Sequence, residues 1–296
     1  MPITIDQLQR WAQAPSETEE TKCQRTVERI KNLLNQHFGS TIEVYLQGSY
    51  RNRTNVKKES DVDIVVEYNA GYYPDFTYLT PQQVEVFFRE VHSPHPYNAI
   101  TFKNDVEKIL TAEFGASFIK RKTKCIKVLK NDYRVNADVI PCCTHKRHIS
   151  PYFIHQDEIG IQFYTDTREK IVSFPKQHSK NSSAKNVATG GKYKDVVRTT
   201  KNIRYKLIEN GIIDKKDIDS HLIECMFWNI RTDYFTTSKS YDELYKNIIA
   251  FTWGDMKDLA KSASYKKVHS FALLFDGSYN PQQAKLFLEK VWNFVS

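Results

Sequence analysis

Apolar residues recur at helical spacing near the start of the chain and at alternate positions soon after it. Ser16 and Glu19 precede the helical pattern with the spacing of a capping box, which marks a helix start. Strand side chains alternate between faces, so the alternation at residues 42–46 predicts a half-buried strand leading into Gly48 and Ser49. The apolar positions of the predicted long amphipathic helix are Val27, Ile30, Leu33, Leu34 and Phe38.

Further elements follow in the first half of the chain. A second strand is predicted at residues 61–68, and residues 71–74 are expected to break it. Helices are predicted after Thr80-Pro81 and around residues 106–114. The segments KCIKVLK and YRVNADVI are expected to form a hairpin joined at Asn131-Asp132.

From about Asp195 the pattern becomes mainly helical, with apolar stripes at 196–208, 222–230, 244–251 and 284–294. Together with the sheet of the first half, this predicts an α+β fold. The stretch FPKQHSKNSSAKNVATGGKYKD between the halves is polar and basic, which is typical of a long exposed connection or lid. We expect two domains: a core lobe with a long N-terminal helix and a sheet at residues 1–165, and a lid with a mainly helical lobe at residues 166–296.

The composition is that of a globular chain of 296 residues with a net charge of +8, which favours polyanionic ligands such as nucleotides, nucleic acid or a membrane surface. No apolar stretch approaches the ~20 residues that span a bilayer, and the first residues do not form a secretory signal. The odd number of cysteines suits a reducing cytoplasm. Cys142 and Cys143 precede His145 and His148, but four zinc ligands with proper spacing cannot be assembled locally.

Three aspartates are the main candidates for chemistry. Asp61 and Asp63 are two residues apart in DVDIVVEY, so on a strand they project from one face and repel each other unless a cation lies between them. Hard divalent ions are the usual occupants, since they prefer oxygen ligands. The alternative is a solvated turn, but the apolar run that follows Asp63 favours a buried strand. Asp138 lies beside the apolar residues of VNADVI, which favours a functional role over that of an exposed hairpin carboxylate.

Several motifs resemble the polymerase beta superfamily of nucleotidyltransferases. The chain is similar in particular to the bacterial CD-NTases, relatives of cyclic GMP-AMP synthase and oligoadenylate synthase, and to their branch that often uses pyrimidine nucleotides. The segments that carry this resemblance are Gln47-Gly48-Ser49, Arg51, Thr54, SDVD at 60–63, ADVIP at 137–141, GIQFYTDT, PKQHSKN, AKN and IECMFWNIRTDYF.

The resemblance implies two lobes, a mixed sheet lobe and a helical lobe, with the active site in the cleft between them. It also implies synthesis of a cyclic dinucleotide or trinucleotide second messenger from NTPs. UTP and ATP are the expected substrates. In bacteria such enzymes act in anti-phage defence, where the product activates a cell-killing effector.

The chemistry required is attack of a ribose hydroxyl on an α-phosphate, with pyrophosphate leaving. Asp61 and Asp63 are expected to bridge two Mg²⁺ or Mn²⁺ ions, and Asp138 to hold the ion that activates the hydroxyl. Gly48 permits close backbone approach to phosphates, and Ser49 offers a hydroxyl and an N–H group. The nucleotide-binding candidates are Gln47, Gly48, Ser49, Arg51, Asn181, Lys201 and Ser220.

Four of these candidates have equal or better structural interpretations. Arg51 is a phosphate ligand or a solvated loop arginine. By resemblance, Lys201 reaches the triphosphate, and its alternative is an ordinary basic surface. Ser220 binds a phosphate or caps a helix, and capping is the role we expect. Asn181 is the candidate for reading the base edge, because an amide both donates and accepts, and its alternative is a turn asparagine.

Two other functions compete with this one. A template-independent RNA or tRNA nucleotidyltransferase also suits a basic protein. A catalytically silent nucleic-acid sensor with this fold is expected to lack one of the carboxylates, and all three are present. The basic surface is also consistent with activation by RNA or another ligand.

Overall fold

The computed structural model describes residues 3–14, 17–56, 61–90, 97–150 and 156–296. The chain forms two compact units. The sheet unit comprises Ser16–Arg51 and Glu59–Lys176, and the helical unit comprises Met1–Pro15, Asn52–Lys58 and Gln177–Ser296. The predicted domains were continuous stretches divided after residue 165, whereas here two N-terminal segments group with the helical unit. Arg198 of the helical unit donates to the carbonyls of Ala12 and Arg53, both at 2.6 Å, and so bonds to both segments.

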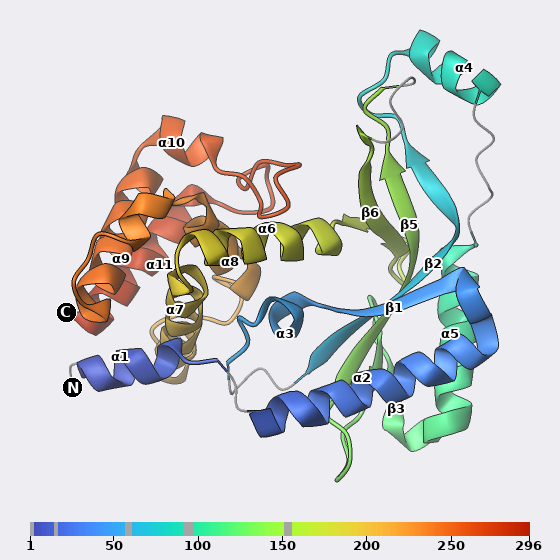
Figure 1. Ribbon diagram of the computed structural model, residues 1–296, viewed down its shortest axis with the longest axis horizontal. Coiled ribbons are helices and arrows are strands. Elements are labelled where there is room, and N and C mark those ends of the chain that lie inside the picture. The colour runs from blue at the N-terminus through green and yellow to red at the C-terminus, as the bar shows by residue number, and fades with distance from the viewer. Residues whose placement is uncertain (1–2, 15–16, 57–60, 91–96, 151–155) are drawn as a thin grey trace. The chain divides into compact units, whose positions relative to one another are not determined.

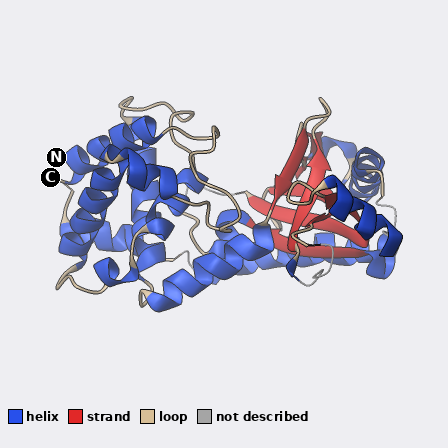
Figure 2. Cartoon of the chain, turned by 90° about the horizontal axis from the view of Figure 1, so that it is seen from above, coloured by secondary structure: helices blue, strands red, loops and turns tan. Residues whose placement is uncertain are grey.

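The sheet unit contains a seven-stranded mixed sheet, and Figure 2 shows the strands confined to this unit. The order is β1-β2-β5-β4-β3, with β6 paired to the far part of β5 and β7 paired to β6. Among the strands that the structure describes, β2 and β5 form the one parallel pair. The strands are β1 Ile42–Gln47, β2 Val62–Asp75, β3 Ile119–Arg121, β4 Ile126–Val128, β5 Ala137–Arg147, β6 Glu158–Tyr164 and β7 Lys170–Ser173.

Helices α2 and α5 pack on one face of this sheet (Figure 1). Because strand side chains alternate, Val62, Ile64 and Val66 of β2 point into this core. The carboxylates at the alternate positions must therefore lie on the opposite face. The helices of this unit are α2 Glu17–Phe38, α3 Gly48–Asn52, α4 Pro81–Glu90 and α5 Ala99–Phe114, with short 3₁₀ turns η1 Gly39–Thr41 and η2 Ala116–Phe118.

The helical unit has its own apolar core, drawn from α1, α7, α8, α9 and α11. Helix α6 begins in the sheet unit and continues into the helical unit. None of the helices in the described ranges combines the length and apolar character that a membrane span requires. The bounds are α1 Ile5–Ala12, α6 Pro175–Ala188, α7 Lys192–Glu209, α8 Ser220–Asn229, η4 Thr232–Phe235, α9 Tyr241–Lys257, α10 Leu259–Ser264 and α11 Pro281–Val295.

The α+β prediction is confirmed, and so are the predicted hairpin, now β4 and β5, and the helix after Thr80. The proposed break at residues 71–74 is wrong, because β2 continues through it with a register shift between Tyr68 and Tyr72. A bulge absorbs the irregularity without ending the strand. Ser16 and the side chain of Glu19 lie outside the described residues.

Residues 174–195, expected to be an exposed connection or lid, form α6 and the start of α7 instead. Tertiary contacts override the weak helix propensity of this Ser- and Asn-rich segment. Asn181 donates to the carbonyl of Val268 at 2.7 Å, and Lys185 donates to the carbonyl of Ile230. Gly190 and Gly191, both with positive φ, separate the two helices.

Candidate active site

A row of four polar residues crosses the sheet from β1 to β4. Gln47 is paired with Asp63, Asp63 with Asp138, and Asp138 with Lys127. Residues paired in register on neighbouring strands project from the same face of a sheet. We call these four residues the polar row, and it lies on the face opposite α2 and α5.

Asp61 lies next to this row, two residues before Asp63. Its Oδ2 accepts a hydrogen bond from the ammonium of Lys127, and the same ammonium lies 4.0 Å from Asp138 Oδ1. The side chains of Asp61, Asp138 and Lys127 are 34%, 27% and 21% exposed. A lysine therefore lies between two of the three predicted carboxylates, close to the protein surface.

The electrostatics of the site follow from this crowding. Burial raises the pKa of Asp138, the ammonium of Lys127 opposes that shift, and the charge of Asp61 adds to it. The hydrogen bond to Asp61 raises the pKa of Lys127, so the lysine remains an ammonium. Burial, followed by the charge of Asp138, raises the pKa of Cys125 to about 12, which keeps this neighbouring residue a neutral thiol.

Gly48 begins α3 directly after β1, and it has φ +67. A Cβ at this position would overlap Asp63 Oδ2 and would lie 3.4 Å from Asp63 Cγ. The structure thus places the Gly-Ser turn against one of the predicted carboxylates. Ser49 is half-buried in the first turn of α3, and Arg51 is exposed on the same short helix.

The three aspartates fit a hard divalent ion by their chemistry. All offer oxygen ligands: Asp63 and Asp138 project from one face of the sheet, and Asp61 directly precedes β2. Asp138 Oδ1 is buried without a hydrogen-bond partner in the described structure. The present arrangement is not a closed metal site, since among the described residues no three His, Cys, Asp or Glu side chains are gathered closely enough to hold an ion. Lys127 supplies the positive charge there instead.

Lys201, predicted to reach a triphosphate, is fully buried in α7. Its ammonium donates to Glu224 Oε1 at 2.9 Å and to Thr54 Oγ1 at 3.4 Å. Glu224 also accepts from Thr54 at 2.6 Å, and it contacts His178 Nε2 at 3.1 Å and Asn52 Nδ2 at 3.4 Å. We call these five residues the Glu224 cluster. It gives Lys201 a structural partner, and a phosphate contact by Lys201 stays a prediction.

The remaining candidates also lie in helices. Asn181 accepts from Gln177 at 2.8 Å and donates to the Val268 carbonyl, so both ends of its amide are bonded within the helical unit. Ser220 is the first residue of α8, but the helix cap is Asp219, which accepts from the N–H of Leu222. The expected capping role of Ser220 is therefore wrong, and its phosphate role stays a prediction.

Sequence reasoning assigned no role to Lys127 or to Glu224. The predicted hairpin placed Lys127 near Asp138 in principle, but the register of the two strands was needed to pair them. Glu224 lies in an apolar helix, IECMFW, where a lone carboxylate signals a buried partner. That signal was available in the sequence.

Two family models match the chain. A family model described as the cGAS/DncV-like nucleotidyltransferase C-terminal helical domain matches residues 180–296, and a nucleotidyltransferase domain model matches residues 27–159. The chain is 36% identical over 297 residues to the cyclic dipurine nucleotide synthase of Elizabethkingia meningoseptica, covering 100% of this chain and 99% of that protein.

Two further relatives are named for products that contain pyrimidine bases, whereas the first is named for purine products. The chain is 31% identical over 297 residues to the cyclic dipyrimidine nucleotide synthase CdnE of Cecembia lonarensis, covering 99% of this chain and 98% of that protein. The solved structure of the Rhodothermus marinus CdnE c-UMP-AMP synthase with Apcpp and Upnpp is 29% identical, with a TM-score of 0.83 over 99% of this chain and 97% of that one.

Proposed function

The chain belongs to the CD-NTases, the cGAS/DncV-like nucleotidyltransferases, and from this premise we propose that it makes a uridine-containing cyclic dinucleotide or trinucleotide from NTPs in a metal-dependent reaction. The observation that carries the proposal is the polar row. Asp63 and Asp138 lie in register on parallel strands, with Asp61 two residues away and Gly48 directly against Asp63.

In the proposed reaction, a ribose hydroxyl forms a new O–P bond at an α-phosphate while the bond to pyrophosphate breaks. Asp61 and Asp63 would hold both Mg²⁺ ions, and Asp138 would hold the ion nearest the attacking hydroxyl. Bound Mg²⁺ would lower the pKa of that hydroxyl and neutralise charge on the phosphates. Gly48 lets the backbone approach a phosphate closely, and Ser49 offers an N–H group and a hydroxyl to it.

The choice of uridine rests on the resemblance of PKQHSKN to the pyrimidine-using branch, and two of the relatives above are named for pyrimidine products. UTP and ATP are the proposed substrates. Asn181 is the proposed base-reading residue, and reading a base would require its amide to release Gln177 or Val268.

The proposed setting is anti-phage signalling in the cytoplasm. There the product would activate an effector, and nucleic acid or another ligand would switch synthesis on. A net charge of +8 suits such polyanionic partners.

The deciding experiment incubates pure protein with labelled NTPs and a divalent ion, with and without RNA, and identifies the product by mass spectrometry. We expect a phosphatase-resistant cyclic product that contains uridine and forms without RNA. Label found only on added RNA would instead support an RNA nucleotidyltransferase, and a product without uridine would remove the base assignment.

The metal assignment is tested with the double variant Asp61→Asn, Asp63→Asn, which should abolish synthesis because the ions lose their bridging ligands. The matched control is Asp132→Asn, an exposed carboxylate in the β4–β5 turn, which should retain wild-type turnover. Circular dichroism would check that both variants fold. Substantial synthesis by the folded double variant would refute the assignment.

A further inference from the structure

Lys127 occupies a position that the proposed reaction does not explain. Its ammonium is hydrogen-bonded to Asp61 and lies 4.0 Å from Asp138 Oδ1. These are two of the three carboxylates proposed to bind metal. A cation from the protein itself therefore lies among the oxygens that a divalent ion would need.

The position is built into the sheet. Lys127 is the middle residue of the short strand β4, and its backbone pairs directly with Asp138 on β5. Register pairing directs both side chains to the same face, which brings the lysine ammonium to the carboxylates. With only 21% of its side chain exposed, Lys127 is not a freely solvated surface lysine.

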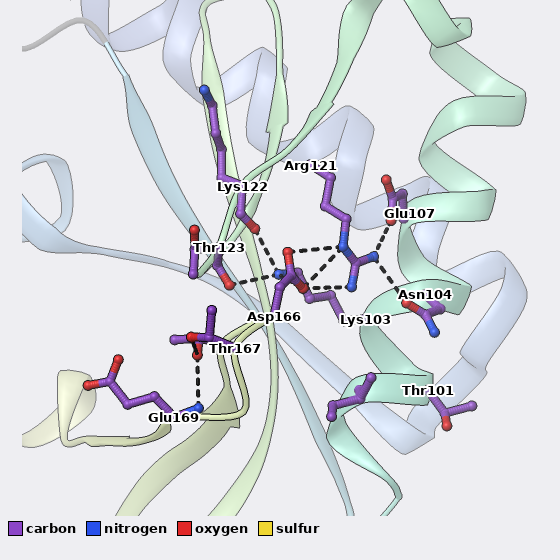
Figure 3. Close-up of polar contacts among 12 residues, drawn as sticks. Thr101, Lys103, Asn104, Glu107, Arg121, Lys122, Thr123, Asp166, Thr167 and Glu169 are labelled. Atoms are coloured by element: carbon purple, nitrogen blue, oxygen red, sulfur yellow. Dashed lines mark hydrogen bonds and ion pairs between the residues drawn. The ribbon is translucent and has the colours of Figure 1, made fainter.

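The turn before β4 is also held in place (Figure 3). The buried ammonium of Lys103 on α5 donates to the backbone carbonyls of Lys122 and Thr123 at 2.8 and 3.0 Å. It also bonds Asp166 at 3.0 Å, and the N–H of Asp166 donates to the Thr123 carbonyl. These contacts anchor the segment that leads into β4. The side chain of Lys127, with its rotatable bonds, is the part that can move most easily.

An ammonium and a divalent ion cannot share these carboxylate oxygens. Both are cations, and at about 4 Å the repulsion between like charges is large where water is partly excluded. The ion also needs the lone pairs to which the ammonium donates. The long, flexible lysine side chain can rotate away, whereas Asp138 lies within β5 and Asp61 directly precedes β2.

We propose that Lys127 is a displaceable counter-ion: it neutralises Asp61 and Asp138 while no metal is bound, and a divalent ion must displace it in order to bind. The inference rests on the proposed function, since it takes these aspartates as the metal ligands. Lys127 thereby weakens the binding of free metal and sets the concentration at which the site fills.

The test measures Mn²⁺ binding to the nucleotide-free full-length protein by isothermal titration calorimetry. Lys127→Met removes the competing charge and should tighten Mn²⁺ binding about tenfold or more. Lys127→Arg keeps the charge and should leave the affinity within about threefold of wild type. The matched control is Lys120→Met, because Lys120 is the exposed partner of Lys127 on β3 and should not change the affinity.

A second readout is the thermal midpoint of the same proteins. In EDTA, Lys127→Met should unfold at a lower temperature than wild type, because its carboxylates repel one another without a counter-ion, and Mn²⁺ should raise its midpoint more than that of wild type. If Lys127→Met does not fold, Lys127→Gln serves as the uncharged variant. It should likewise bind Mn²⁺ more tightly than wild type and unfold at a lower temperature in EDTA.

The outcomes separate this inference from the proposed function. Equal Mn²⁺ affinity for wild type and the uncharged variant, with binding still lost in Asp61→Asn, Asp63→Asn, would overturn the counter-ion role and leave the metal assignment standing. Mn²⁺ binding that does not depend on the aspartates would overturn both. Weaker binding in the uncharged variant would show that Lys127 assists the metal, which also contradicts the inference.

Discussion

Gly48 must be glycine for two independent reasons. Its φ of +67 lies in the left-handed region, where a side chain costs free energy. A Cβ would also overlap the carboxylate of Asp63. The backbone conformation affects folding, whereas the contact with Asp63 affects the site. Comparison with Gly39, which shares only the backbone conformation, separates the two effects.

Gly39 has a similar φ of +59, but a Cβ there would meet no atom within 4 Å. Both Gly48→Ala and Gly39→Ala should therefore lose about 1 kcal/mol of stability from backbone strain. Only Gly48→Ala should also lose synthesis, by about 100-fold, because it displaces Asp63 or the turn beside it. Turnover and urea unfolding of both variants are the measurements. A similar fall in turnover in both variants, or in neither, would contradict the contact with Asp63.

The helices of the helical unit are joined by a buried charge cluster as well as by apolar packing. Glu224 of α8 bonds Lys201 of α7 and His178 of α6, and it also bonds the segment after α3 through Thr54. This segment follows the Gly-Ser turn in the chain and belongs to the helical unit. Removing one partner from a buried pair costs more than the pair itself contributes, since the other charge is left uncompensated.

Glu224→Gln should therefore lower the free energy of unfolding by about 3 kcal/mol at pH 7, because Lys201 remains buried without its counter-ion. Burial alone would raise the pKa of Glu224, but Lys201 and His178 hold it well below the ordinary value of 4.5. A lowered folded pKa means that the stabilisation is complete above about pH 4.5 and is lost as the pH falls further. The difference between wild type and variant should shrink accordingly in acid.

Urea titrations at pH 7 and pH 4 measure this difference. Glu209→Gln is the control, since Glu209 forms an exposed ion pair with Lys206 on α7 and should change stability by less than about 0.5 kcal/mol. Equal stability of wild type and Glu224→Gln at pH 7 would show that the cluster does not stabilise the unit.

The charge of the complete chain acts over longer distances than any of these contacts. A protein with a net charge of +8 attracts nucleoside triphosphates, and salt screens this attraction beyond about 8 Å at physiological ionic strength. The KM for NTP should therefore rise severalfold between 50 and 300 mM KCl, whereas kcat should change less, because the bound substrate is already in contact with the site.

Steady-state kinetics over this salt range test the prediction. Potassium acetate at equal ionic strength controls for specific effects of chloride, and the thermal midpoint confirms that the protein stays folded. A KM that does not change with salt would mean that local contacts, rather than the overall charge, govern substrate capture.

Local patterns were sufficient to identify the main parts of the candidate site. The apolar run after Asp63 predicts a buried strand, and the period of two along a strand places Asp61 and Asp63 on one face. Both predictions could be made without knowing which strand pairs with this one. The Gly-Ser turn, the hairpin around Asn131 and most helices were likewise readable, since each depends on residues within about one or two turns of the chain.

Pairing between distant segments decided the rest. The register of β2 against β5 places Asp138 beside Asp63, and that of β4 against β5 brings Lys127 to Asp138. Folding also buries Lys201 against Glu224 and turns the expected lid into α6. The sequence by itself determined which residues could do chemistry, because side-chain type and strand period are local properties. Only the tertiary structure decided which charges meet, because register and burial depend on strands and helices that are far apart in the chain.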